Sequence, residues 1–112
     1  MSYTRRVDVV AALADPTRRR ILELLVDGDV PAGELADRFP VSRPAVSRHL
    51  RVLREAGLVQ VRVDRQRRLY SLDPTPLAEL DEWLAPYRRL WSQRLDALDT
   101  EIRRGRRDRR TT

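Results

Sequence analysis

The segment VSRPAVSRHLRVLREAGLVQVRVDRQRRLYSL, residues 41–72, decides the fold of this chain. Ser42 is placed to cap a helix, and Gly57 is placed to end it. Valines then alternate with polar side chains, and Leu69–Leu72 is typical of a return strand after a turn at residues 64–68. A basic helix beside a basic hairpin predicts a winged helix-turn-helix, mainly α, with about five helices and a two-stranded wing.

Positive charge is concentrated in this same segment. Residues 42–70 hold eight arginines and two acids, a local charge of +6, whereas residues 1–41 sum to −1 and residues 71–102 to −4. The last ten residues, 103–112, sum to +5 and contain no apolar side chain. We therefore expect one domain at 1–102, followed by a disordered basic tail. The uneven charge indicates a nucleic-acid-binding surface at the helix and hairpin.

The composition narrows the classes of protein. A length of 112 residues with 41% hydrophobic side chains fits one globular domain. The chain has no cysteine and one histidine, which argues against disulfides and against a metal or cofactor site. No apolar run approaches the roughly 18 residues of a membrane span, so we expect a cytoplasmic protein. No nucleophile–base pair or glycine-rich phosphate loop is present, so we do not expect an enzyme.

Helical periodicity and capping residues predict the remaining helices. These are about Thr4–Ala14, Pro16–Val26 after an Asp15 cap, Pro31–Arg38, and a long helix opened by Thr75 and Pro76. Pro86 lacks a backbone donor within that last helix, so we expect a kink or a short break there.

The helix at 42–56 and the wing at 58–72 are the predicted DNA-binding elements. Val46, Leu50 and Leu53 share one helical face and should be buried, whereas Arg48 points the opposite way and suits bidentate contact with guanine. The residues that we predict to bind DNA are Arg43, Pro44, Ser47, Arg48, His49, Arg51 and Arg54 on the helix, and Arg65, Arg67 and Arg68 on the wing. His49 has two interpretations, a packed hydrogen-bonded residue or a direct DNA contact.

Three stretches together resemble the ArsR/SmtB family of bacterial winged-helix repressors. They are ALADPTRRRILELL (12–25), GELADRFPVSRPAVSRHLRVLREAGLV (33–59) and RRLYSLD (67–73), and the resemblance extends over about residues 5–100. It implies a homodimer formed by the first and last helices, which binds operator DNA and usually releases it when an effector binds. The predicted partners are therefore double-stranded DNA, a second copy of the chain and an unidentified small-molecule effector.

The metal sites of that family do not carry over to this chain. One type needs cysteines where this sequence has Pro31, Ala32 and Gly33, and the other needs histidines on the last helix, which has none. The pattern WLAPYRRLWSQRLDAL, residues 83–98, is similar to a branch of the family that does not sense metals.

An apolar stripe on the last helix and valines on the first are the predicted dimer contacts. They are Val7, Val10, Leu80, Trp83, Leu84, Tyr87, Trp91, Leu95 and Leu98. The aromatic members have a second interpretation, a pocket for an apolar effector at the dimer interface. The leading functional hypothesis is a homodimeric repressor that binds a palindromic operator. The alternatives are a sequence-tolerant architectural DNA-binding protein and a winged-helix module that binds protein.

Overall fold

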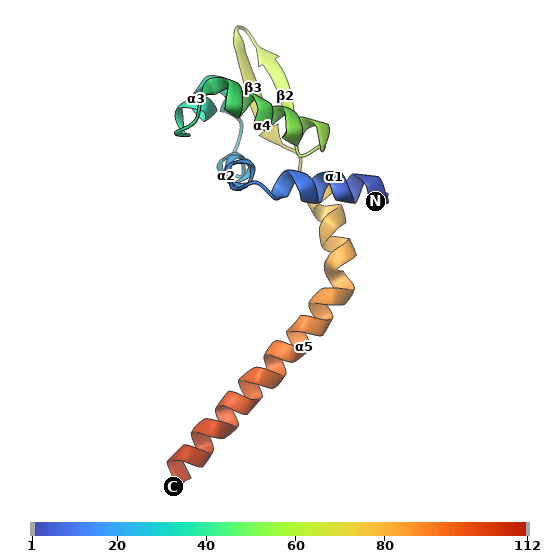
Figure 1. The fold of residues 1–112 in the computed structure, drawn as a ribbon, viewed down its shortest axis with the longest axis vertical. Coiled ribbons are helices and arrows are strands. Elements are labelled where there is room, and N and C mark those ends of the chain that lie inside the picture. The colour runs from blue at the N-terminus through green and yellow to red at the C-terminus, as the bar shows by residue number, and fades with distance from the viewer. Residues whose placement is uncertain (1, 112) are drawn as a thin grey trace. The chain divides into compact units, whose positions relative to one another are not determined.

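The computed structural model describes residues 2–111, with side chains described as far as residue 106. The chain divides into two compact units, Met1–Leu80 and Asp81–Thr112. Five helices and three strands occur in the described range (Figure 1). They are α1 (Tyr3–Leu13), α2 (Pro16–Leu25), β1 (Val30–Pro31), α3 (Ala32–Asp37), α4 (Arg43–Glu55), β2 (Val59–Asp64), β3 (Arg67–Leu72) and α5 (Thr75–Thr111).

The core of the first unit is aliphatic and draws on α1 to α4 and the sheet. On α4 the three predicted side chains, Val46, Leu50 and Leu53, are all buried. On α1 the buried residues are Val9 and Ala12, which the sequence analysis did not select. The other buried members of the cluster are Ile21, Leu22, Leu25, Leu35, Ala56, Leu58, Val59 and Tyr70.

Both ends of α4 are defined by local hydrogen bonds, as predicted. The Ser42 hydroxyl accepts from the Ala45 N–H at 3.3 Å. At the other end Gly57 has φ +77, a left-handed conformation that suits glycine. The Gly57 and Leu58 N–H groups donate to the Arg54 and Leu53 carbonyls, each at 2.9 Å. This pair of bonds is a Schellman motif, so α4 ends before the wing begins.

The predicted two-stranded wing is the β2–β3 hairpin, and a short strand that was not predicted, β1, adds to it, so the sheet has three antiparallel strands in the order β1-β3-β2. Val30 pairs with Tyr70 and Pro31 with Leu69. Pro31, which was predicted to open a helix, instead ends the short edge strand β1. An edge strand tolerates proline, because the missing N–H need not donate to a neighbouring strand. The predicted third helix accordingly begins one residue later, at Ala32.

The turn of the hairpin is shorter than the predicted 64–68. Asp64 pairs with Arg67, which leaves two residues between the strands. The first of them, Arg65, has φ +59, which is uncommon for a residue other than glycine. The β2–β3 hairpin projects beyond the helices of the first unit (Figure 1). Val63, near the tip of the hairpin, is 73% exposed.

Helix α5 is continuous across Pro86, so of the predicted kink or short break the break is absent. The helix is described as far as Thr111, and the disorder expected for residues 103–112 stays a prediction. Arginine is a good helix former, and the Arg103 side chain pairs with Asp99 one turn earlier at 3.1 Å. Within the described residues, no helix is long and apolar enough to cross a membrane.

The start of α2 depends on Asp15, whose carboxylate accepts from the Arg18 N–H at 3.0 Å. Pro16 occupies the first helical position, as predicted. The hydrogen bond from the Arg18 backbone is the main cause that lowers the pKa of Asp15, and the charges of His49 and Arg18 lower it further. Partial burial opposes these effects.

Replacing this cap tests its contribution to stability. We predict that Asp15→Ala lowers the free energy of unfolding by about 1 kcal/mol at pH 7. Because the pKa of Asp15 in the folded state lies below its ordinary value of 3.8, this contribution is present above that pH and is lost as the pH falls through the folded pKa. Urea unfolding of both proteins between pH 7 and pH 2.5 measures it. A stability difference that stays constant over this range would contradict the assignment.

Candidate nucleic-acid interface

The face of α4 opposite the core is polar and exposed. Pro44, Ser47 and Arg48 are all exposed, and Arg51 and Arg54 continue the surface toward the C-terminal end of the helix. The burial of Val46, Leu50 and Leu53 fixes the rotation of α4, so these predicted side chains face away from the core. The predicted DNA-binding residues of α4 are therefore exposed to solvent, except for His49, which is partly buried.

Arginines in the first unit fall into two groups. Most of them hydrogen-bond to carbonyls or pair with acids, as Arg20 does with Glu23 and Arg62 with Asp29. Among residues 2–80, the arginines whose side chains make no hydrogen bond or ion pair are Arg48, Arg51, Arg54, Arg65 and Arg68. All five lie on α4 or at the hairpin tip and all five belong to the predicted DNA-binding set. Their charge is therefore not neutralised within the unit.

Two other predicted residues are paired, but only at the surface. Arg43 lies 3.2 Å from the Asp37 carboxylate, and Arg67 lies 3.8 Å from that of Asp64. All four side chains are largely exposed. Solvent-exposed pairs of this kind contribute about 0–1 kcal/mol, so a phosphate can replace the carboxylate at little cost.

The tight turn sets the spacing of charge at the hairpin tip. Arg65 stands within the two-residue turn, while Arg67 and Arg68 begin β3 on successive positions. Successive strand residues point to opposite faces of the hairpin. The three arginines therefore present charge on more than one side of the tip, which suits a strand inserted beside a nucleic-acid backbone.

His49 is packed against α2, which agrees with the first of its two interpretations. Its side chain is 22% exposed, and its Nδ1 lies 3.4 Å from Nη1 of Arg18. The Asp15 carboxylate is 3.8 Å from the same nitrogen. Arg18 was not predicted as a partner of His49. The two residues are 31 positions apart, so no local sequence pattern links them.

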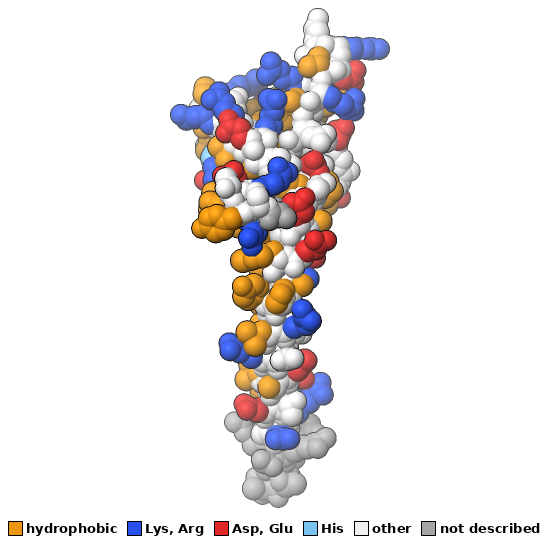
Figure 2. Space-filling model, turned by 90° about the vertical axis from the view of Figure 1, so that its right-hand side faces the viewer, with side chains coloured by type: hydrophobic (Ala, Val, Ile, Leu, Met, Phe, Trp, Pro, Cys, Tyr) orange, Lys and Arg blue, Asp and Glu red, His pale blue; other side chains and the backbone are white. Residues whose placement is uncertain are grey.

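Most of the predicted dimer contacts are exposed apolar side chains on α1 and α5, but Leu80 packs against the core of the first unit and Leu84 is only partly exposed. On α1, Val7 and Val10 are about half exposed, and Tyr3 is largely exposed. On α5, apolar side chains gather along the helix (Figure 2) and include Trp83, Tyr87, Leu90, Trp91, Leu95, Leu98 and Ile102. The Trp83 and Tyr87 rings contact each other, with centroids 5.4 Å apart. Monomeric proteins rarely expose so long an apolar stripe.

No cluster of three or more His, Cys, Asp or Glu side chains suited to a metal ion occurs in the part of the chain that the structure describes.

Comparison with known proteins agrees with this geometry. The model of a helix-turn-helix domain matches residues 13–62, which span α2 to β2. The HTH-type transcriptional regulator Rv2034 of Mycobacterium tuberculosis is 59% identical over 69 residues, which cover 62% of this chain and 64% of that regulator. The transcriptional repressor SdpR of Bacillus subtilis is 40% identical over 69% of this chain and 86% of its own length.

A solved structure supplies the family name. The ArsR-like transcriptional regulator from Rhodococcus sp. RHA1 superposes with a TM-score of 0.70 at 35% identity, over 86% of this chain and 91% of that one. The chain belongs to the ArsR family. It is a helix-turn-helix transcriptional regulator of that family, as the sequence resemblance predicted. The domain match of this ArsR-family member ends at residue 62, before the hairpin tip and α5. Those two elements carry the wing arginines and most of the exposed apolar stripe.

Proposed function

We propose that this protein is a homodimeric transcriptional repressor that binds a palindromic operator in the cytoplasm. Helix α4 enters the major groove and the β2–β3 hairpin lies against the neighbouring backbone. The observation that carries this proposal is the set of five unpaired arginines on α4 and the hairpin tip. Repression follows from occupation of a promoter.

Within α4, base reading is assigned to the first two turns, which a major groove admits most deeply. Arg48 is exposed and unpaired there, and its planar guanidinium matches the two acceptors of a guanine edge. Ser47 is exposed beside it and suits a base edge or a phosphate. Arg43 suits a phosphate after exchange of Asp37, and Pro44 adds an apolar contact.

The remaining arginines are assigned to the DNA backbone. Arg51 and Arg54 lie farther along α4, where the helix leaves the groove. Arg65, Arg67 and Arg68 at the hairpin tip suit phosphates or a narrow minor groove, whose negative potential attracts guanidinium groups. These contacts raise affinity for any duplex, whereas Arg48 supplies discrimination between sequences.

Arg48→Ala tests the assignment of base reading. A lost bidentate contact is worth about 1–3 kcal/mol, so we expect affinity for a selected operator duplex to fall about 5- to 150-fold. Fluorescence anisotropy at fixed salt measures this change, with a scrambled duplex in parallel. Arg20→Ala is the matched control, because it removes the same charge from an exposed pair on α2 and should change operator affinity less than about twofold. An unchanged affinity for Arg48→Ala would show that α4 does not read bases.

The dimer is assigned to the exposed apolar surfaces of α1 and α5. The exposed α5 stripe follows three- and four-residue steps from Trp83 through Tyr87, Trp91 and Leu95 to Leu98, so it occupies one side of the helix. Burying it against a second copy would remove several large side chains from water, at about 25 cal/mol per Å2 of apolar surface. Val7 and Val10 form a separate exposed apolar surface on α1, which is also assigned to the dimer. Trp83, Tyr87 and Trp91 also mark where an apolar effector would compete with the second chain.

Trp91→Asp tests the dimer. A carboxylate in the centre of the apolar stripe should leave the protein monomeric at micromolar concentration in sedimentation experiments. Gln93→Asp is the matched control, since it places the same carboxylate on the opposite side of the same helix. We expect this control and the wild type to sediment as dimers. Wild-type protein that sediments as a monomer would contradict the dimer assignment.

A further inference from the structure

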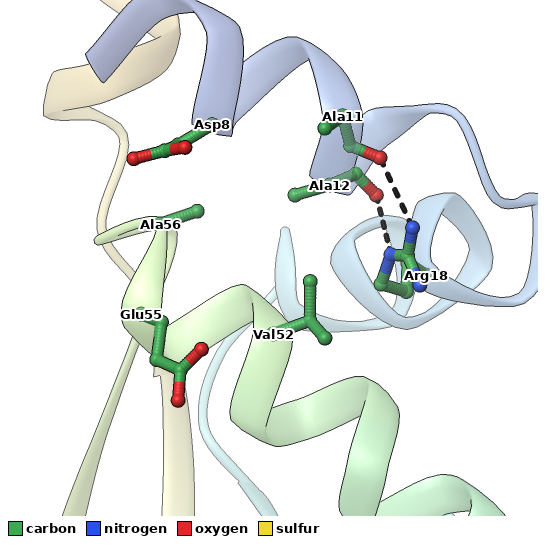
Figure 3. A pocket seen from close by; sticks show the side chains of 7 residues that line it. All are labelled: Asp8, Ala11, Ala12, Arg18, Val52, Glu55 and Ala56. Carbon is green, nitrogen blue, oxygen red and sulfur yellow. Dashed lines mark hydrogen bonds between the residues drawn. The ribbon is translucent and has the colours of Figure 1, made fainter. Parts of the chain in front are cut away.

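The side chain of Arg18 ties the C-terminal end of α1 to its own helix, α2. Its Nε donates to the Ala12 carbonyl at 2.7 Å, and its Nη2 donates to the Ala11 carbonyl at 3.0 Å (Figure 3). The last carbonyls of a helix lack intrahelical donors and form the negative end of its dipole. The guanidinium therefore supplies a donor to the Ala12 carbonyl, adds a second donor to the Ala11 carbonyl, which also accepts from the Ala14 N–H at 3.2 Å, and neutralises this end of α1.

The third nitrogen of the same guanidinium lies against α4. Its Nη1 is 3.4 Å from Nδ1 of His49. Arginine only donates hydrogen bonds, so Nδ1 must accept, and the neutral ring then carries its proton on Nε2. The Asp15 oxygen at 3.8 Å from Nδ1 is too distant to accept a hydrogen bond from it. Arg18 thus selects both the partner and the tautomer of His49.

This link spans a gap between two helices. A hollow of about 290 Å3 lies between α1 and α4, and Figure 3 shows α1 residues on one side of it and α4 residues on the other. Its lining consists of Asp8, Ala11, Ala12, Arg18, Val52, Glu55 and Ala56. The small alanine side chains leave α1 and α4 loosely packed at this point. A side chain that reaches both helices has more effect on their spacing there than it would in a filled core.

His49 occupies a position on α4 where a small rotation matters. It lies between Arg48, the residue assigned to base reading, and Leu50, which is buried. We propose that Arg18 is a positioning residue for DNA recognition, which orients α4 through His49 and links α4 to the end of α1. The proposal rests on the function assigned to α4 above. Since α1 also carries Val7 and Val10, the link joins the assigned dimer surface to the assigned reading helix.

Arg19 provides a matched control. It lies on the same helix and caps the same end of α1, with Nη1 3.0 Å from the Leu13 carbonyl and 3.5 Å from that of Ala14. Its side chain makes no hydrogen bond or ion pair with α4 in the described structure. Arg18→Gln and Arg19→Gln therefore remove equal charge and similar caps, and only the first loses the link to His49.

The test compares the affinities of these variants for the selected operator and for a scrambled duplex, at a temperature well below each melting midpoint. We expect Arg18→Gln to weaken operator binding about tenfold, with binding of the scrambled duplex within about twofold, and Arg19→Gln to change neither beyond about twofold. His49→Phe should reproduce the loss. The double variant Arg18→Gln/His49→Phe should lose no more operator affinity than either single variant, because both single substitutions remove the same Arg18–His49 contact. Equal losses for the two arginine variants, or additive losses in the double variant, would overturn the proposal.

The ring of His49 gives a second readout that a purely structural role would not move. It is the only histidine in the chain, so its ring nitrogen signals in NMR need no further assignment. We expect a ring protonated on Nε2 in the wild type and in Arg19→Gln, and a mixture of tautomers in Arg18→Gln. An unchanged tautomer in Arg18→Gln would overturn the inferred contact.

Two outcomes separate this proposal from the proposed function. If the wild type binds operator and scrambled duplexes equally, the assignment of sequence-specific reading fails, while the ring spectra still test the Arg18–His49 contact.

If Arg18→Gln does not fold, Arg18→Lys replaces it. Lysine keeps the charge but cannot contact both helices, so operator affinity should still fall relative to Arg19→Lys. Equal affinities of the two lysine variants would overturn the proposal.

Discussion

Burial of Val46, Leu50 and Leu53 is the constraint on which the rest of the site depends. These side chains leave α4 only one face to present to solvent, and that face carries Ser47 and Arg48. Each fully buried aliphatic side chain contributes about 1.5–3 kcal/mol. A rotation of α4 that turned Arg48 inward would lose this burial and would also place an unpaired charge in an aliphatic core.

Capping fixes the length of α4 as burial fixes its rotation. Ser42 begins the helix and the Schellman motif at Gly57 ends it. The chain therefore enters β2 within a few residues, and the hairpin is held beside α4. Its two-residue turn then brings arginines to the tip. The unpaired arginines follow from these local rules, together with the absence of acids near enough to neutralise them.

Features that depend on neighbouring residues were predictable from the sequence. The caps at Asp15 and Ser42, the buried face of α4 and the hairpin all follow from periodicity and residue type. Features that depend on distant partners were not predictable. Strand β1 forms because Val30 meets Tyr70, and the Arg18–His49 contact likewise joins positions far apart in the chain. The turn was misjudged because Arg65 adopts a conformation for which glycine is the usual signal.

We propose that α4 reads a defined DNA sequence, once in each half of a symmetric site. Selection of bound duplexes from a random DNA pool by this protein measures whether it does. We expect enrichment of an imperfect palindrome, with half-sites about one helical turn or a multiple apart. Recovery of duplexes with no shared sequence, bound through charge alone and released steeply by salt, would contradict it.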